Sequence, residues 1–298
     1  MKNDRMIPVF DLKECAPDTD FMVHTFEGTE MYEAITRPHR LTTYKISLLL
    51  EGEVSNYTDF KEYTTKAPAL LFLSPGQVYQ HVGNSWHKMV SVKFYKDFLM
   101  NEAQGILSCW ECLFNQVILP INSKTALEEL ETYAHLMEQE YVHRRPQRDL
   151  VVRNLLTAFV VAAARLGSCE TKILQMNSSE NKLVKQFHSL TDEHFLKYTQ
   201  VSQYADMLYV TPGHLNDLTK MATGRTAKQI IDEKRVMEAK RLLFWGKHSA
   251  KEIANHLNIE DDAYFNRFFK KHTGQTPALF LKHSREKYNE YPDNVNVL

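Results

Sequence analysis

The sequence of 298 residues is poor in glycine and cysteine, and it contains no long apolar run. Its 10 glycines form no glycine-rich phosphate loop, and no nucleophile stands beside a base in a recognisable arrangement. The most apolar stretch, residues 155–166, is shorter than the roughly 18 apolar residues that a membrane span needs. We therefore expect no catalytic residue, no cofactor and no membrane partner.

Cysteine usage and the start of the chain both favour a cytoplasmic location. Four cysteines are too few for a disulfide framework in a chain of this size, and they fit a reducing compartment. The first residues lack the apolar core of a secretory signal. Cys109 and Cys112 form a Cys-x-x-Cys pair, but no second pair or His partner accompanies it. We expect no metal or redox site there.

Charge is balanced over the whole chain but is unevenly distributed. The 36 Lys and Arg residues nearly cancel the 37 Asp and Glu residues, which gives a formal net charge of -1. Residues 181–298 hold 18 basic and 14 acidic side chains, so residues 1–180 are acidic by five charges. This weak asymmetry favours the C-terminal part as the one that meets a polyanion.

The N-terminal third of the sequence predicts β-strands. β-Branched and aromatic runs are separated by Glu-Gly, Ala-Pro and Pro-Gly turns; they cover residues 44–54, 55–65, 69–82 and 88–95. Short strands at this spacing favour a small antiparallel barrel or sandwich within residues 1–96. An N-terminal arm, residues 1–22, precedes it, and its Phe10 and Phe21 are suited to cover the barrel mouth.

Residues 97–166 read as helical. Apolar residues recur at helical spacing in 123–144, which Ser123 can cap, and in 146–166. The short turn between these helices predicts antiparallel packing. The pair carries more apolar surface than it needs for itself, so we expect a homodimer through this region; the side chains in question are Leu150, Leu155, Phe159, Val160 and Ala163. The polar stretch 167–180 is the expected linker.

The remaining chain contains two similar helical segments, 201–231 and 249–281, which residues 227–246 join as one helix. In the second segment Ser249 and Glu252 form a capping box, and Asn258 stands where the chain must turn sharply. A buried stripe follows at helical spacing; it consists of Phe265, Phe268, Phe269 and His272. Two short helices around a tight turn, present twice, predict a pair of helix-turn-helix units.

Residues 181–285 resemble the DNA-binding domain of the AraC/XylS family of bacterial transcription regulators. The matching positions are Ile253, Ala254, Leu257, Tyr264, Phe265, Arg267, Phe269, Lys270, Lys271, Gly274, Thr276 and Pro277. The resemblance implies a DNA-binding domain over 181–298, with units at about 201–223 and 249–272 that enter successive major grooves of double-stranded DNA. It also implies RNA polymerase as a partner.

Carried over by position, the side chains that face DNA are Gly213, Asn216, Asp217, Lys220, Arg225, Asp262, Ala263, Asn266, Arg267, Lys270 and Lys271. Asn and Arg are the residues that bond adenine and guanine bidentately, so Asn266 and Arg267 are the expected base readers. Asp217 departs from the family pattern, in which Arg is frequent at this position. We expect affinity to rest on phosphate contacts from the basic side chains.

Residues 37–82 resemble, less specifically, the cupin-like effector barrel of the same family. A metal-binding cupin needs a His-x-His pair, but Leu41 stands two positions after His39, so we expect no metal. Candidates for a small-molecule pocket are Arg40, Tyr44, Tyr57, Tyr79, His81 and Trp86. The same side chains also suit an ordinary barrel core and rim.

Together these patterns predict an α+β chain with an N-terminal cupin-like barrel, a helical dimerisation region and a C-terminal double helix-turn-helix domain. The expected function is an effector-responsive transcription regulator that binds specific DNA, most simply an activator, and not an enzyme. Two alternatives stay open: an architectural DNA-binding protein whose barrel only dimerises, and a cupin enzyme with a DNA-binding tail.

Overall fold

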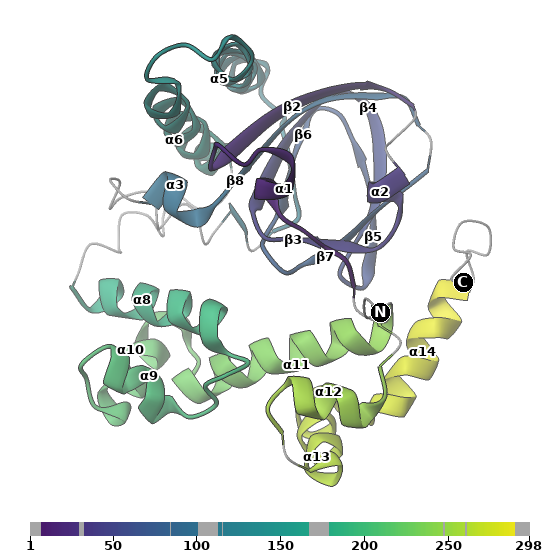
Figure 1. Cartoon of the computed structure of the whole chain (residues 1–298), viewed down its shortest axis with the longest axis vertical. Helices are drawn as coiled ribbons and strands as arrows, with labels where there is room; N and C mark the ends of the chain where they lie inside the picture. The colour runs from purple at the N-terminus through teal and green to yellow at the C-terminus, as the bar shows by residue number, and fades with distance from the viewer. Residues whose placement is uncertain are drawn as a thin grey trace. The chain divides into compact units, whose positions relative to one another are not determined.

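Strand β4 (Tyr44–Thr58) organises the N-terminal part because it is paired on both sides along most of its length. In the computed structural model, its first half pairs with β8 (His87–Phe94) and β6 (Ala69–Leu73). Its second half pairs with β7 (Val78–Val82) and β5 (Lys61–Lys66). All four pairings are antiparallel, so one strand ties two sheet segments together (Figure 1).

The structure describes residues 7–29, 33–83, 85–100, 113–114, 116–166, 179–246, 248–259 and 261–289. The chain divides into two compact units, one formed by Pro8–Gln175 and the other built on Met176–Leu298. Most of the predicted linker lies outside the described residues, as do Cys109 and Cys112.

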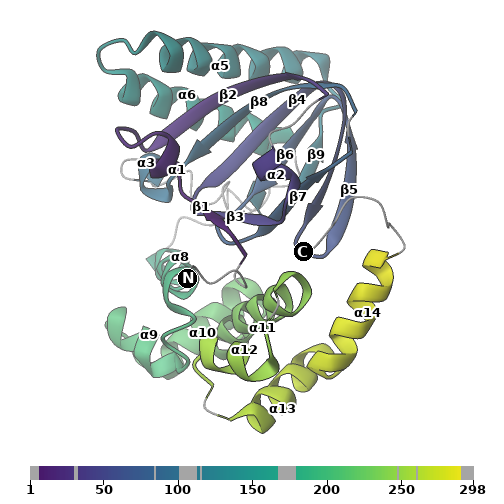
Figure 2. The same ribbon diagram turned by 45° about the vertical axis from the view of Figure 1, so that its right-hand side comes forward.

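The other strands complete a strongly curled sheet that forms half a barrel (Figure 2). Strand β2 (Phe21–Gly28) pairs with β8, and β9 (Ile118–Pro120) pairs with β6. Strand β3 (His39–Leu41) pairs with β7 and, in parallel, with β1 (Val9–Phe10). Short helices lie between the strands: α1 (Leu12–Cys15), α2 (Glu33–Thr36) and α3 (Lys96–Met100).

A bulge in β4 changes which side chains face the barrel interior. The register against β8 shifts between Leu49 and Glu51, so the predicted Glu-Gly turn is wrong: the strand continues through it and ends at Thr58. Before the bulge, odd-numbered residues face inward, as Ser47 shows by its bond to Ser91. After it, even-numbered residues do, because a bulge adds one unpaired residue to the alternation.

A pair of helices covers the opposite face of the sheet. Helix α5 (Lys124–His143) is capped by Ser123 as predicted, and α6 (Arg148–Leu166) packs beside it (Figure 1). Their buried residues join Ile46, Leu48 and other strand residues in one core. Phe159, Val160 and Ala163 lie in this core and not on an exposed face, which corrects their assignment to a dimer surface.

Residues 8–22 of the proposed N-terminal arm are part of the barrel unit. Phe21 is the first residue of β2, and its fully buried ring packs against Phe98 and Tyr141, so it does not cover the barrel mouth. Phe10 on β1 stacks on His39, with ring centroids 4.8 Å apart. Phe10 also packs against Leu41, Leu73 and Tyr79.

The second unit is entirely helical where it is described, and α11 (Ala227–Trp245) is its shared element, as the sequence predicted. The other helices are α8 (Ser179–His194), α9 (Val201–Met207), α10 (Pro212–Thr223), α12 (Ala250–His256), α13 (Asp262–Thr273) and α14 (Pro277–Asn289). The first half of α11 packs in a core with α8–α10, and its second half in a separate core with α12 and α13. Figure 1 shows the two groups at opposite ends of this helix.

Gly52 in the bulge region of β4 is fixed by a close approach of the chain. Its φ is +81°, and an added Cβ would lie 2.1 Å from the Trp86 carbonyl oxygen. Gly83 has φ +82° but has space, with the nearest atom 3.9 Å from the added Cβ. We expect Gly52→Ala to lower the free energy of unfolding of the barrel unit by ~1–3 kcal/mol more than Gly83→Ala does, because both strain the backbone but only Gly52→Ala overpacks.

Urea denaturation of the three proteins measures this difference. Equal losses in the two variants would mean that the backbone conformation alone, and not the contact with Trp86, requires glycine at position 52.

Candidate nucleic-acid interface and barrel cavity

Both helix-turn-helix units form as expected, and local signals in the sequence set their turns. Asn258 takes φ +54° between α12 and α13, and Tyr209 takes φ +56° at the corresponding place between α9 and α10. Ser249 and Glu252 form the predicted capping box, and Asp261 accepts hydrogen bonds from two backbone N–H groups of α13. Asn tolerates this left-handed conformation well, whereas a bulky Tyr does so at a cost.

Helix α13 presents one buried and one exposed face. Phe265, Phe268 and Phe269 are buried, as the predicted stripe requires. The predicted DNA-facing residues of this helix are all exposed: Asp262, Ala263, Asn266, Arg267, Lys270 and Lys271. Arg267 approaches Asp261 at 3.8 Å, but both side chains are well exposed, so water screens this pair and leaves the guanidinium accessible.

Helix α10 offers a less basic surface. Gly213, Asp217 and Lys220 are exposed, so one acidic and one basic side chain face outward there. Next to α10, the exposed Arg225 donates to Glu233 on α11 at 2.6 Å. The positive charge that could attract DNA is therefore concentrated on α13.

Asn216 has a structural task that its position in the repeat did not reveal. Its amide oxygen accepts a hydrogen bond from the Ala227 backbone N–H at 3.0 Å, at the first residue of α11. The side chain is only partly exposed. That Asn216 faces DNA stays a prediction, but its acceptor already helps cap α11. Asn266 differs, since its amide donates to the Asp262 carbonyl at 2.8 Å and leaves its oxygen to solvent.

Arg235 in the middle of α11 holds the second helix-turn-helix unit (α12 and α13) in place. It is 3% exposed, its guanidinium donates to the Leu257 carbonyl at the end of α12 at 2.6 Å, and it lies over the ring of Phe268 at 5.3 Å. Burial lowers the pKa of Arg235, and Asp232 opposes that shift. The sequence held one signal: Arg235 stands four residues from both Ile231 and Ala239, which are fully buried.

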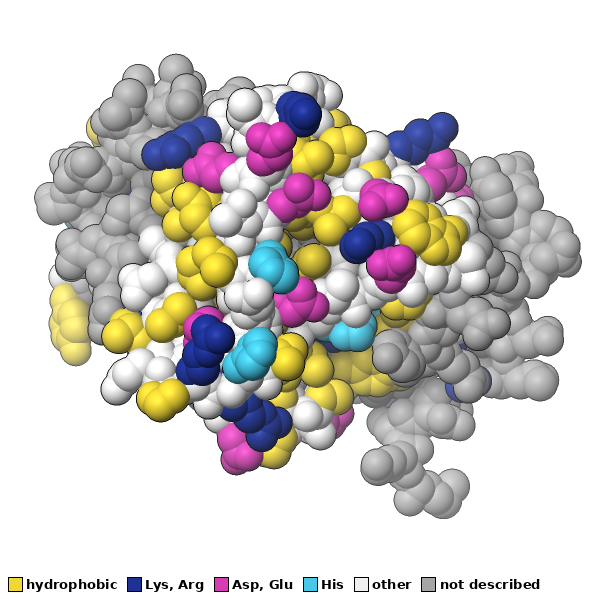
Figure 3. Space-filling view, turned by 90° about the horizontal axis from the view of Figure 1, so that it is seen from above, with side chains coloured by type: hydrophobic (Ala, Val, Ile, Leu, Met, Phe, Trp, Pro, Cys, Tyr) yellow, Lys and Arg dark blue, Asp and Glu magenta, His cyan; other side chains and the backbone are white. Residues whose placement is uncertain are grey.

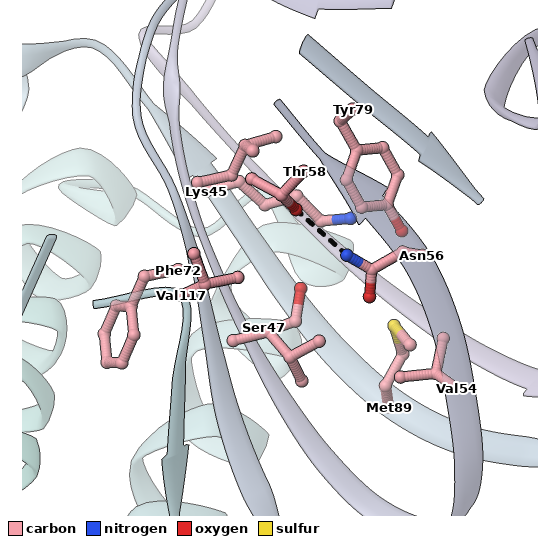
Figure 4. A pocket seen from close by; sticks show the side chains of 11 residues that line it. Lys45, Ser47, Val54, Asn56, Thr58, Phe72, Tyr79, Met89 and Val117 are labelled. Atoms are coloured by element: carbon pink, nitrogen blue, oxygen red, sulfur yellow. Dashed lines mark hydrogen bonds between the residues drawn. The ribbon is translucent and has the colours of Figure 1, made fainter. Parts of the chain in front are cut away.

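The barrel contains a small cavity of about 20 Å³ with a few polar groups in its lining. Figure 4 shows the Lys45 ammonium, the Asn56 amide and the Tyr79 hydroxyl pointing toward one another, and the Asn56 amide donates to Thr58 at 3.0 Å. Apolar side chains, among them Val54, Leu71 and Met89, line the rest. Burial and the neighbouring Lys93 lower the pKa of Lys45 to about 7.

Only some of the predicted pocket residues face this cavity. Tyr79 lines it, and His81 is buried directly opposite Asn56 in the β4–β7 register. Tyr44 belongs to the core under α5 and α6, and Tyr57 bonds Glu62 on the outer face, so both assignments are corrected. Tyr44 precedes the β4 bulge and faces the helices, whereas the bulge turns the odd-numbered Tyr57 away from the interior.

The last two candidates lie elsewhere. Arg40 stands opposite Val78 and one residue out of phase with His39, whose ring contacts Tyr79, so strand alternation directs Arg40 away from that ring. Trp86 is 43% exposed. Sequence reasoning missed Lys45 and Asn56, although polar residues alternating with apolar ones in β4 were a usable signal.

No group of three or more His, Cys, Asp or Glu side chains that could hold a metal ion occurs in the described part of the chain. Burial lowers the pKa of His39 and of His81 to about 4, so both imidazoles are neutral at pH 7. In the same residues, no helix is both long and apolar enough to cross a bilayer.

Two helix-turn-helix units on one shared helix define the second unit as a DNA-binding domain. Residues 204–283 match the family model described as a helix-turn-helix domain. The bifunctional transcriptional activator and DNA repair enzyme AdaA of Bacillus subtilis is 34% identical over 100 residues, which is 33% of this chain and 47% of AdaA. The chain thus spans about half the length of this relative.

Two further similarities extend the comparison. The arabinose operon regulatory protein of Salmonella typhimurium is 22% identical over 284 residues, covering 89% of this chain and 95% of that protein. The DNA-binding domain of AdpA, solved with a target DNA, is 21% identical over 35% of this chain and 94% of its own, with a TM-score of 0.33. Residues 204–283 of the second unit are therefore a helix-turn-helix domain that is similar to those of transcription regulators.

Replacing Arg235 tests its role in holding the second helix-turn-helix unit in place. We expect Arg235→Ala to lower the free energy of unfolding of the DNA-binding domain by ~1.5–3 kcal/mol, because the Leu257 carbonyl loses a charged donor inside the protein. The neighbouring Lys234→Ala should change it little, since the ion pair of Lys234 with Asp192 is exposed. Thermal or urea unfolding gives both values, and similar effects of the two changes would contradict this role.

Proposed function

We propose that this protein is an effector-responsive transcription regulator that binds specific double-stranded DNA through α10 and α13. The observation that carries the proposal is the pair of recognition helices joined by α11, each with an exposed outer face. A helix of 19 residues is ~28 Å long at 1.5 Å per residue. This length approaches the ~34 Å helical repeat of DNA, so both helices can enter successive major grooves on one face of the duplex.

The two recognition helices contribute unequally in this proposal. On α13, Arg267 and Asn266 have the chemistry to read guanine and adenine, while Lys270 and Lys271 suit phosphates. On α10, Lys220 supplies charge, and Asp217 suits a cytosine amino group better than a phosphate. The helix-turn-helix unit of α13 therefore supplies most of the affinity, and that of α10 refines the choice of sequence.

The barrel is the effector domain in this proposal. A ligand bound there changes DNA binding or activation only by favouring one arrangement of the two units over another. The regulator acts in the cytoplasm of a bacterial cell, where the DNA is, and its partner in activation is RNA polymerase, as the resemblance to the family suggests. No reaction is assigned to the chain; the repair activity in the name of AdaA belongs to that protein.

Selection of duplexes from a random library with the full chain tests specific DNA binding, and variants then test the roles of single residues. Arg267→Ala should weaken binding to the selected site by ~1–3 kcal/mol and relax the preference at one base pair. Lys271→Ala should weaken all sequences alike and reduce the slope of log affinity against log salt by about 1.

Lys88→Ala is the matched control for Lys271→Ala, because it removes the same charge from the barrel unit and not from the recognition helix. It should leave DNA affinity unchanged. If Arg267→Ala lost affinity equally on selected and random DNA, Arg267 would be a phosphate contact and not a base reader. Absence of any selected sequence would leave the architectural alternative.

We also propose that the regulator is a homodimer through α5 and α6. Four apolar side chains on these helices stay at least 38% exposed: Leu136, Val142, Leu150 and Val151. Figure 3, seen from above the view of Figure 1, shows hydrophobic side chains interspersed with charged ones on that side and no single large patch. An interface of this mixed kind is typical of a moderate, reversible association.

Leu150→Lys should therefore shift the full chain toward monomer, because it places a charge among apolar side chains in the contact. Sedimentation velocity at several concentrations measures this. Leu279→Lys on α14 changes a side chain of similar exposure in the other unit and should leave the distribution unchanged. A wild-type chain that stays monomeric at micromolar concentration would remove the dimer from the proposal.

A further inference from the structure

Two lysines lie side by side on the inner face of the sheet. Lys45 on β4 and Lys93 on β8 are direct register partners, in the same column as the bonded pair Ser47 and Ser91. Both are partly buried. The Lys45 ammonium lies over the Tyr79 ring, 5.2 Å from its centroid, but neither ammonium forms a hydrogen bond or ion pair with any described residue. Like charges directly opposite in a sheet are destabilising, and burial adds to the cost. An anion between them would remove this cost.

Two buried acceptors, one on β4 and one on β7, lack donors. The Oδ1 atom of Asn56 is buried and has no hydrogen-bond partner, although its amide donates to Thr58. His81, opposite Asn56, donates from Nε2 to the Gly83 carbonyl at 3.1 Å, so its orphaned Nδ1 is a second acceptor. Buried acceptors without donors are uncommon in folded proteins, and they fit a ligand that donates hydrogen bonds.

We infer that the barrel binds a small hydroxycarboxylate, with its carboxylate at Lys45 beside Lys93 and a hydroxyl that donates to Asn56. The Tyr79 hydroxyl, which points into the same cavity, provides a further donor for the carboxylate (Figure 4). The lowered pKa of Lys45 agrees with a charge site that lacks its counter-ion. The volume of about 20 Å³ holds roughly one water, so the flexible Lys45 side chain moves when a ligand enters.

This inference rests on the proposed effector role of the barrel, but binding can be measured without DNA. Met89 lines the cavity, so its side-chain methyl group reports on the ligand. Full-length protein labelled at the methionine methyl carbons is titrated with lactate at constant ionic strength. Two matched probes are propionate, which lacks the hydroxyl, and propane-1,2-diol, which lacks the charge. We expect a saturable shift of the Met89 resonance with lactate and binding roughly tenfold or more weaker with either probe.

Variants separate recognition of the ligand's carboxylate from recognition of its hydroxyl. Lys45→Met should abolish the response to lactate, and it removes a buried charge, so the protein should fold at least as well. Lys66→Met, at an 81% exposed lysine side chain on β5, should change nothing. Asn56→Leu should make lactate and propionate equivalent.

Three results would overturn the inference: no saturable shift with lactate, equal affinity for lactate and propionate in the wild-type protein, or a response that survives Lys45→Met. None of them bears on the DNA selection experiment, so failure here leaves the proposed DNA binding untouched, and failure of DNA binding leaves this site untouched.

Discussion

The DNA-binding surface depends on one constraint, which is that helix α11 is buried in two separate cores. Its first half packs with α8, α9 and α10, and its second half packs with α12 and α13. Because the helix is continuous, the spacing and the rotation of α13 relative to α10 follow from its length and its twist. Arg235, at the middle of the helix, adds a direct bond to the α12–α13 turn. A fixed spacing of this kind is what recognition of two successive grooves requires.

Helical features could be predicted well from the sequence because their signals are local. The capping box of Ser249 and Glu252, the left-handed Asn258 and the phenylalanine stripe of α13 each follow from neighbouring residues. Asn216 shows the limit of this reasoning. Its position in the repeat predicts a side chain that faces DNA, but its bond to Ala227 joins residues eleven apart, and only the folded chain reveals that bond.

The barrel interior could not be predicted in the same way, because it depends on long-range register. Tyr44 and Tyr57 look like pocket residues in the sequence, yet one packs beneath the helices and the other lies on the outer face. Residue type predicted Tyr79 correctly as a lining residue, but not Lys45 or Asn56. A single bulge decides the outcomes for Asn56 and Tyr57, and no local pattern in 44–58 marks it beyond the presence of Gly52.

That bulge makes the lining of the barrel unusually easy to change. A strand's side chains alternate, so removal of one residue near Glu51 would turn every later side chain of β4 to the opposite face. Asn56 and Thr58 would leave the interior, and Tyr57 would enter it, with no substitution anywhere. Barrels with this bulge can thus differ in their lining through a single codon insertion or deletion, while the helix-turn-helix units stay the same.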